Sequence, residues 1–90
     1  MIRSLEIAVE ELRRQIDDLA RQAFPFADMQ AEIEEARGYL KKAGEYGTSR
    51  DEDKAVFALL YAGVCYGVGL SELKQAQELK RKIDEILGST

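Results

Sequence analysis

The strongest constraint on the fold is an uncharged run of 17 residues, 55–71 (AVFALLYAGVCYGVGLS), in a chain where 33% of the residues are charged. Its apolar residues go round every face of a helix instead of forming one stripe, and such a helix has to be covered on every side. In a chain of 90 residues, the cover comes from the other helices or from a second copy. We therefore expect one domain over residues 1–90 with this run at its centre.

Charged residues are spread along the chain without a basic patch. The formal net charge is −4, from 17 acidic and 13 basic residues, and the two signs are interleaved through both halves. Nucleic-acid binding requires clustered lysine and arginine side chains to contact phosphates, so we expect no nucleic-acid partner. The basic triplet Lys80, Arg81 and Lys82 lies in the last turns of an expected helix, where the helix dipole favours cations.

The residue content also limits the chemistry. The chain has one cysteine and no histidine, which excludes a disulfide within the chain and leaves no ligand set for structural zinc. We expect no metal and no cofactor. The uncharged run is shorter than the roughly 20 residues of a spanning helix, which favours a buried core helix over a membrane span. The N-terminal sequence MIRSLEIAVEELRRQ has acidic residues too early for a secretory signal, so we expect a cytoplasmic protein.

The first expected helix covers residues 2–23. Its apolar residues recur in steps of three and four, as in a heptad pattern. They are Ile2, Leu5, Val9, Leu12, Ile16, Leu19, Ala23 and Phe26. Pro25 is expected to end this helix, because proline disfavours helical geometry at the residue before it and has no amide donor.

The second expected helix covers residues 26–46. It begins with either Pro25 in its first turn or Asp28 as its N-cap. Gly38 lies inside this helix and costs about 1 kcal/mol relative to alanine, which predicts a close contact with another helix. Gly44 and Gly47, near its end, are expected to stop it.

The third and fourth expected helices cover residues 50–68 and 72–87. Ser49 and Glu52 have the spacing of a capping box at the start of the third helix. At the sequence GVGLS we expect a break, with Ser71 as a new N-cap. One continuous helix over both ranges is the alternative.

Together these segments predict an all-α fold, an antiparallel three- or four-helix bundle that self-associates. Two heptad-spaced seams supply the candidate interface: the apolar seam of the first helix and a seam of small residues in the third, where two backbones can approach closely. The candidate interface residues are Leu5, Val9, Leu12, Ile16, Leu19, Ala58, Ala62 and Cys65. We expect a homodimer or another homo-oligomer, with a different protein as a possible partner.

No residue pattern points to catalysis. Without histidine, acid–base chemistry depends on a carboxylate, lysine, tyrosine or cysteine whose pKa is displaced. The acidic residues fall in clusters typical of solvated helix faces. Cys65 has no basic neighbour in sequence and is interpreted as a small hydrophobic core residue. We therefore expect a non-enzymatic module that acts by protein–protein interaction.

One short segment resembles an enzyme family. The sequence LRRQIDDL at residues 12–19 is similar to the opening of the small all-α chorismate mutases, which are intertwined dimers. The resemblance implies that Arg13 binds a substrate carboxylate and that Lys41 takes the position of a family lysine. The chain departs from the family at Gln30, where a second active-site arginine is expected, and at Pro25, which interrupts the family's long first helix.

A second resemblance concerns a helical hairpin. Ala36, Leu40 and Ala43, followed by Gly63 and Tyr66, resemble parts of a tetratricopeptide hairpin. The resemblance implies a monomeric adaptor that holds a peptide or partner protein in a groove lined by tyrosines. The chain has room for fewer than the roughly three repeats that such arrays need for stability.

Overall fold

The structure, a computed structural model, describes residues 3–24, 26 and 29–88, and nearly all of these residues are helical. The helices are α1 (Arg3–Ala23), α2 (Gln30–Thr48) and α3 (Glu52–Gly88), and no strand occurs in the described ranges. The expected all-α class is therefore confirmed.

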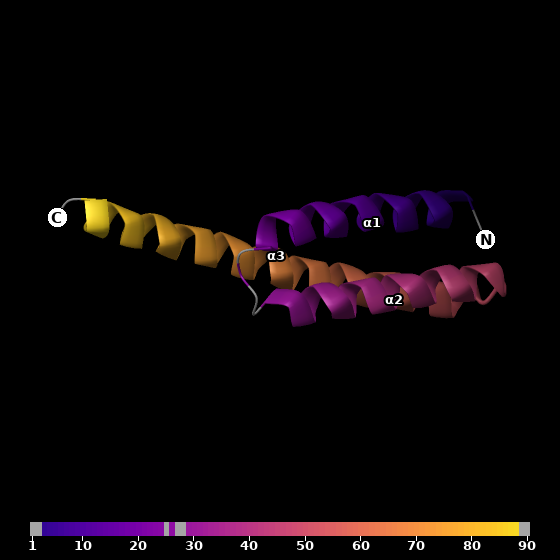
Figure 1. Ribbon diagram of the computed structural model, residues 1–90. Coiled ribbons are helices and arrows are strands. Elements are labelled where there is room, and N and C mark those ends of the chain that lie inside the picture. The colour runs from indigo at the N-terminus through magenta and orange to yellow at the C-terminus, as the bar shows by residue number, and fades with distance from the viewer. Residues whose placement is uncertain (1–2, 25, 27–28, 89–90) are drawn as a thin grey trace.

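The helices form an elongated molecule. α2 and α3 run antiparallel and make the most extensive contact, while α1 packs along both of them (Figure 1). The last part of α3 continues beyond the other helices toward the C-terminus (Figure 1). The molecule measures 60 × 19 × 15 Å with a radius of gyration of 16.3 Å, whereas a compact domain of this length has a radius of about 12 Å.

The core lies along the line where the three helices meet. Ile16 of α1, Ile33 of α2 and Leu73 of α3 are the largest side chains that are fully buried. Around them the core cluster is completed by further buried apolar residues. These are Leu19, Ala23, Met29, Ala36, Leu40 and Ala62. No polar or charged side chain in the described ranges is buried, so hydrophobic burial supplies most of the stabilising free energy.

The expected break within residues 67–71 is wrong, because α3 is one helix of 37 residues. In the described ranges no glycine has a positive φ, so Gly67 and Gly69 do not turn the chain. A Cβ added to Gly69 would lie 3.0 Å from Leu19 Cδ2. This glycine therefore gives α1 room to approach α3, and Ser71 lies in the helix interior instead of capping a new one.

The expected Ser49 cap is also wrong. The Ser49 hydroxyl donates a hydrogen bond backward to the Tyr46 carbonyl at 3.0 Å, so it serves the end of α2. Asp51 precedes α3 and its side chain accepts a hydrogen bond from the Lys54 amide at 3.4 Å. Its carbonyl accepts the first bond of the helix, from Ala55 N at 3.0 Å. Asp51 is therefore the N-cap of α3.

The connection between α2 and α3 is a Schellman-type turn. The Asp51 amide donates to the Tyr46 carbonyl at 2.9 Å, and the Arg50 amide donates to the Gly47 carbonyl at 3.1 Å. Arg50 takes the left-handed position of this motif, with a φ of 65°, where glycine is usual. The turn reverses the chain and sets α3 antiparallel to α2.

The start of α2 differs from the expectation. The helix begins at Gln30 and ends at Thr48, later at both ends than the predicted range of 26–46. Pro25 and Asp28, the two expected starting residues, lie outside the described residues. Gly38 makes no close helix contact, since no atom lies within 4 Å of the position of an added Cβ.

Candidate functional site

The candidate interface residues lie within the fold of a single chain. Leu5, Ile16 and Leu19 of α1 are buried, and Ala58 and Ala62 of α3 are buried with them. The remaining three are half-buried against the same core. They are Val9, Leu12 and Cys65. The heptad seams are thus occupied inside one chain, and the apolar surface left over comes from other residues.

That surface is concentrated on α3. Ten of the twelve large apolar side chains that are exposed in the described ranges belong to this helix. Five of them follow the spacing of one helix face within the uncharged run, and we call them the outer face. The outer face consists of Phe57, Leu60, Tyr61, Val64 and Val68, with exposed fractions between 45% and 61%. Phe57, Leu60, Val64 and Val68 lie on the side of α3 that α1 and α2 leave open. Tyr61 lies at the edge of this side, where its ring stacks on that of Tyr39 of α2 with the ring centroids 5.4 Å apart.

The C-terminal part of α3 is exposed on all sides. Every residue over 77–88 is exposed, and we call this segment the C-terminal extension. It carries four large apolar side chains: Leu79, Ile83, Ile86 and Leu87, with exposed fractions of 47–67%. Two heptad-spaced steps join the first three of these residues.

Ion pairs along the C-terminal extension support its helical form. Lys80 pairs with Asp84 at 2.8 Å, and Arg81 bridges Glu78 at 2.6 Å and Glu85 at 2.5 Å. Pairs three or four residues apart stabilise a helix by roughly 0.2–0.5 kcal/mol each. The hydrogen bond from Arg81 lowers the pKa of the Glu78 carboxyl, as expected for a carboxylate beside a guanidinium.

The length and composition of α3 also satisfy a simple criterion for membrane spans. An 18-residue stretch of this helix has a mean hydropathy of 1.6, and 22% of that stretch is buried inside the fold. Core helices of soluble proteins satisfy the same criterion, so it does not distinguish a bilayer from a protein partner.

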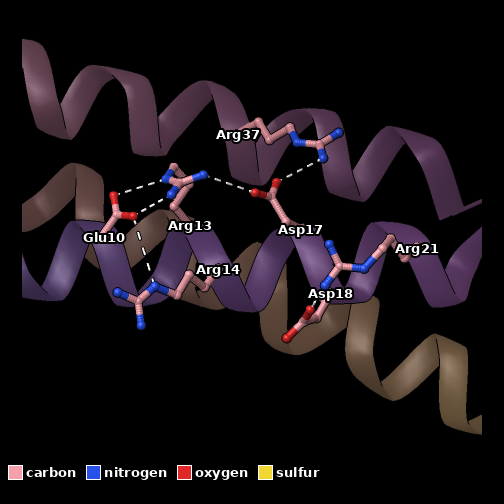
Figure 2. A network of polar contacts seen from close by, with 7 residues as sticks. All are labelled: Glu10, Arg13, Arg14, Asp17, Asp18, Arg21 and Arg37. Atoms are coloured by element: carbon pink, nitrogen blue, oxygen red, sulfur yellow. Dashed lines mark hydrogen bonds and ion pairs between the residues drawn. The ribbon is translucent and has the colours of Figure 1, made fainter.

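A shallow groove between α1 and α2 is lined in part by ion-paired side chains. The cavity has a volume of about 400 Å³ and combines an apolar floor with charged side chains. It is lined by Val9, Arg13, Ile16, Asp17, Arg37, Leu40, Lys41 and Gly44. Asp17 lies between two guanidinium groups, with Arg13 on its own helix and Arg37 on α2 each at 3.2 Å (Figure 2).

Arg13 is fully engaged within this network. It donates hydrogen bonds to both oxygens of Glu10 as well as to Asp17 (Figure 2). The hydrogen bonds from Arg13 lower the pKa of the Glu10 carboxyl, and those to Glu10 raise the pKa of Arg13. Both side chains are exposed to water, where such pairs contribute little to stability.

The structure brings together the two residues that the mutase resemblance singles out. Arg13 and Lys41 line the same groove. Gln30, at the position of the family's second arginine, is the first residue of α2 and is not among the groove residues. The cationic character of the groove therefore comes from Arg13, Lys41 and a residue that the sequence analysis did not single out, Arg37.

Cys65 is half-buried and its thiol approaches Glu35, with Sγ 3.8 Å from Oε2. Burial raises the pKa of the thiol, and the negative charge of Glu35 raises it further. A thiol whose pKa is raised is a poor nucleophile at neutral pH, which agrees with the expected packing role. Among the described residues, no group of three His, Cys, Asp or Glu side chains is arranged to hold a metal ion.

Comparison of the chain with protein-family models, with characterised proteins and with solved structures found no match.

Two features escaped the sequence analysis: the outer face and the exposed state of the C-terminal extension. The signal for the outer face was present as the 4, 3, 4 spacing of Phe57, Tyr61, Val64 and Val68 within the uncharged run. This spacing does not distinguish the outer face, because apolar residues also occupy the other faces of the same run. The sequence does not predict how far α1 and α2 extend along α3.

Proposed function

We propose that the protein is a non-catalytic helical module that acts by self-association through α3. The observation that carries this proposal is the apolar surface on that helix, where ten large side chains are exposed in the single chain. Exposed apolar patches of this extent mark interfaces. A bundle formed with a second copy would remove the patch from water, at roughly 25 cal/mol per Å² of apolar area.

A protein partner fits this surface better than a bilayer. α1 and α2 pack along the same stretch of α3 that is uncharged, and both helices carry exposed ion pairs, such as Arg37 with Asp17. Inserting that stretch into hydrocarbon would require α1 and α2 either to enter with it or to leave the core. Charges at the centre of a bilayer cost at least about 2.5 kcal/mol each.

The test is the molar mass in solution. At about 100 μM, where even a micromolar dimer is mostly assembled, light scattering should give at least twice the mass of the 10.1 kDa chain. Val64→Glu, on the outer face, should lower the mass toward that of the monomer. Ile7→Glu is the matched control, because Ile7 is an equally exposed apolar residue but lies on α1. A monomer for the unmodified protein, or sedimentation with phosphatidylcholine vesicles, would contradict the proposal.

The groove between α1 and α2 favours a second candidate function, a monomeric adaptor. Arg37 and Lys41 of α2 line the groove beside its apolar floor, and these two cationic side chains suit a peptide that presents an acidic residue beside an apolar one. Titration with a short Glu-Leu-rich peptide, followed by fluorescence anisotropy, tests this function. Arg37→Ala together with Lys41→Ala should abolish the binding, whereas Lys74→Ala on α3 should leave it unchanged.

A further inference from the structure

The two exposed parts of α3 point to one specific pairing of two chains. Resting on the self-association proposed above, we infer that α3 pairs antiparallel with α3 of a second copy. In this arrangement the C-terminal extension of each chain lies on the outer face of the other. The partner is thus the same chain, and the site on each copy is complete only when the other copy is present.

The first support is that the two apolar segments share one side of the helix. Leu79 follows Tyr61 by 18 residues, and Ile86 follows Val68 by the same interval. Eighteen residues make about five whole turns at 3.6 residues per turn. Because α3 is continuous from Glu52 to Gly88, Leu79 and Ile86 point in the same direction as the outer face.

The second support is that a polar interval separates the apolar segments. Between Val68 and Leu79 the exposed positions are polar and include Ser71 and Gln75. A twofold axis crossing α3 near Ser71 would place the outer face of each chain against the C-terminal extension of the partner. Leu79 would then lie opposite Val64 of the partner subunit, and a single isologous contact would cover both patches of both chains. A parallel pairing would also cover apolar residues. However, it would place the polar intervals of the two chains against each other and align the two helix dipoles in the same direction, which is unfavourable.

The third support is that the approach is open. Ala62 and Leu73, two of the α3 residues that pack against α1 and α2, are fully buried. Val64 follows Ala62 by two residues, which is a rotation of about 200° around the helix. A second α3 therefore reaches Val64 from the side opposite α1 and α2, and Tyr61 keeps its stacking contact with Tyr39 of α2 at the edge of the outer face.

The available area matches what a stable pair needs. The nine large side chains of the outer face and the C-terminal extension are each exposed by 45–67%. At about 100 Å² each, they present on the order of 900 Å² per chain, close to the roughly 800 Å² per partner of a standard interface.

Charge placement on the C-terminal extension agrees with this arrangement. Glu78 and Arg81 pair on one flank of the apolar stripe, and Lys80 and Asp84 pair on the other. Leu79 lies between these pairs, as an apolar seam lies between the flanking charges of a coiled coil. The ion pairs are satisfied within the chain, so apolar contact can form without burying an unpaired charge.

A charge-swap experiment tests the orientation. In sedimentation equilibrium, Val64→Glu and Leu79→Lys should each weaken dimerisation at least about tenfold in Kd. The double variant should recover to within about threefold of the unmodified protein, because each glutamate then faces a lysine of the partner. In a parallel pair the double variant would place like charges opposite each other and be weaker than either single variant, which would overturn the inference while leaving self-association intact. A monomeric unmodified protein would overturn both.

A distance measurement provides an independent check that does not depend on the charged variants folding. In a Cys65→Ser background, a nitroxide label at Asp84→Cys should lie about 40 Å from its counterpart in the antiparallel pair, and about 20 Å from it in a parallel pair. Circular dichroism of each variant should show unchanged helicity, since Val64 and Leu79 are exposed in the single chain. A single distance near 20 Å in a dimeric sample rules out the antiparallel arrangement.

Discussion

At the scale of single residues, the turn before α3 contains the clearest departure from favourable geometry. Arg50 has a φ of 65°, a region that side chains with a Cβ enter at a cost of about 1 kcal/mol or more. Arg50→Gly should therefore stabilise the protein by about 0.5–1 kcal/mol, even though glycine increases the entropy of the unfolded chain. A urea midpoint that stays constant or falls would show that the arginine side chain contributes a compensating contact.

Cys65 gives a prediction for pH dependence. Burial and the Glu35 carboxylate both raise the pKa of the thiol, so at a given pH less of it is thiolate than in a free cysteine with a pKa of about 8.5. Its alkylation by iodoacetamide at pH 8 should be slow and should accelerate as the pH rises further. Glu35→Gln removes the negative charge, lowers the pKa of the thiol and should speed the reaction at pH 8. Glu34→Gln, an exposed change on the same helix, is the control and should not alter the rate.

At the scale of elements, the sequence predicts α1 and the buried seams well, because steps of three and four are a local property of each helix. It does not predict the continuity of α3. The glycines around Gly69 are typical of a helix break, yet Gly69 lies inside the helix and makes room for Leu19 of α1. The same limit applies to the candidate interface, since a heptad seam such as that of Ile16 and Leu19 indicates burial but not whether the cover comes from the same chain or from another.

Two glycines of α3 distinguish the effect of helix propensity from that of close contact with α1. No atom lies within 4 Å of a Cβ added at Gly67, whereas at Gly69 the Cβ would lie 3.0 Å from Leu19 Cδ2. Gly67→Ala should stabilise the protein by about 0.5–1 kcal/mol through helix propensity. Gly69→Ala should give a smaller gain or a loss, because Leu19 is buried and has little room to move. Equal midpoint shifts for the two variants in urea would mean that α1 does not approach α3 at Gly69.

A larger side chain in the small-residue seam of α3 should destabilise the protein. Ala62 is fully buried in the core cluster, so Ala62→Leu should force the helices apart and destabilise the fold by about 1–3 kcal/mol. If Ala62 faced water instead, leucine would be tolerated as a good helix former. Thermal melts of the variant and of the parent, recorded at the same protein concentration, distinguish these outcomes.

At the scale of the whole molecule, composition predicts an ordered helical domain, but the distribution of apolar surface emerges only when the helices are assembled. α1 and α2 cover one side of α3 and stop short of its end (Figure 1), which leaves the outer face and the C-terminal extension in water. The exposure of these two surfaces cannot be predicted from one segment of sequence. Exposure of the outer face depends on where α1 and α2 lie around α3, and exposure of the C-terminal extension depends on how long α1 and α2 are.

This division of the molecule predicts what deletion of the C-terminal extension will do. A chain ending at Ala76 keeps every buried residue of the described core and should still fold, but it loses one half of each proposed contact with a second copy. Because association stabilises the folded state by mass action, the Tm of the full chain should rise when its concentration increases about a hundredfold. The Tm of the shortened chain should stay nearly constant over the same range. A shortened chain whose Tm still rises with concentration would assign self-association to a surface other than the C-terminal extension.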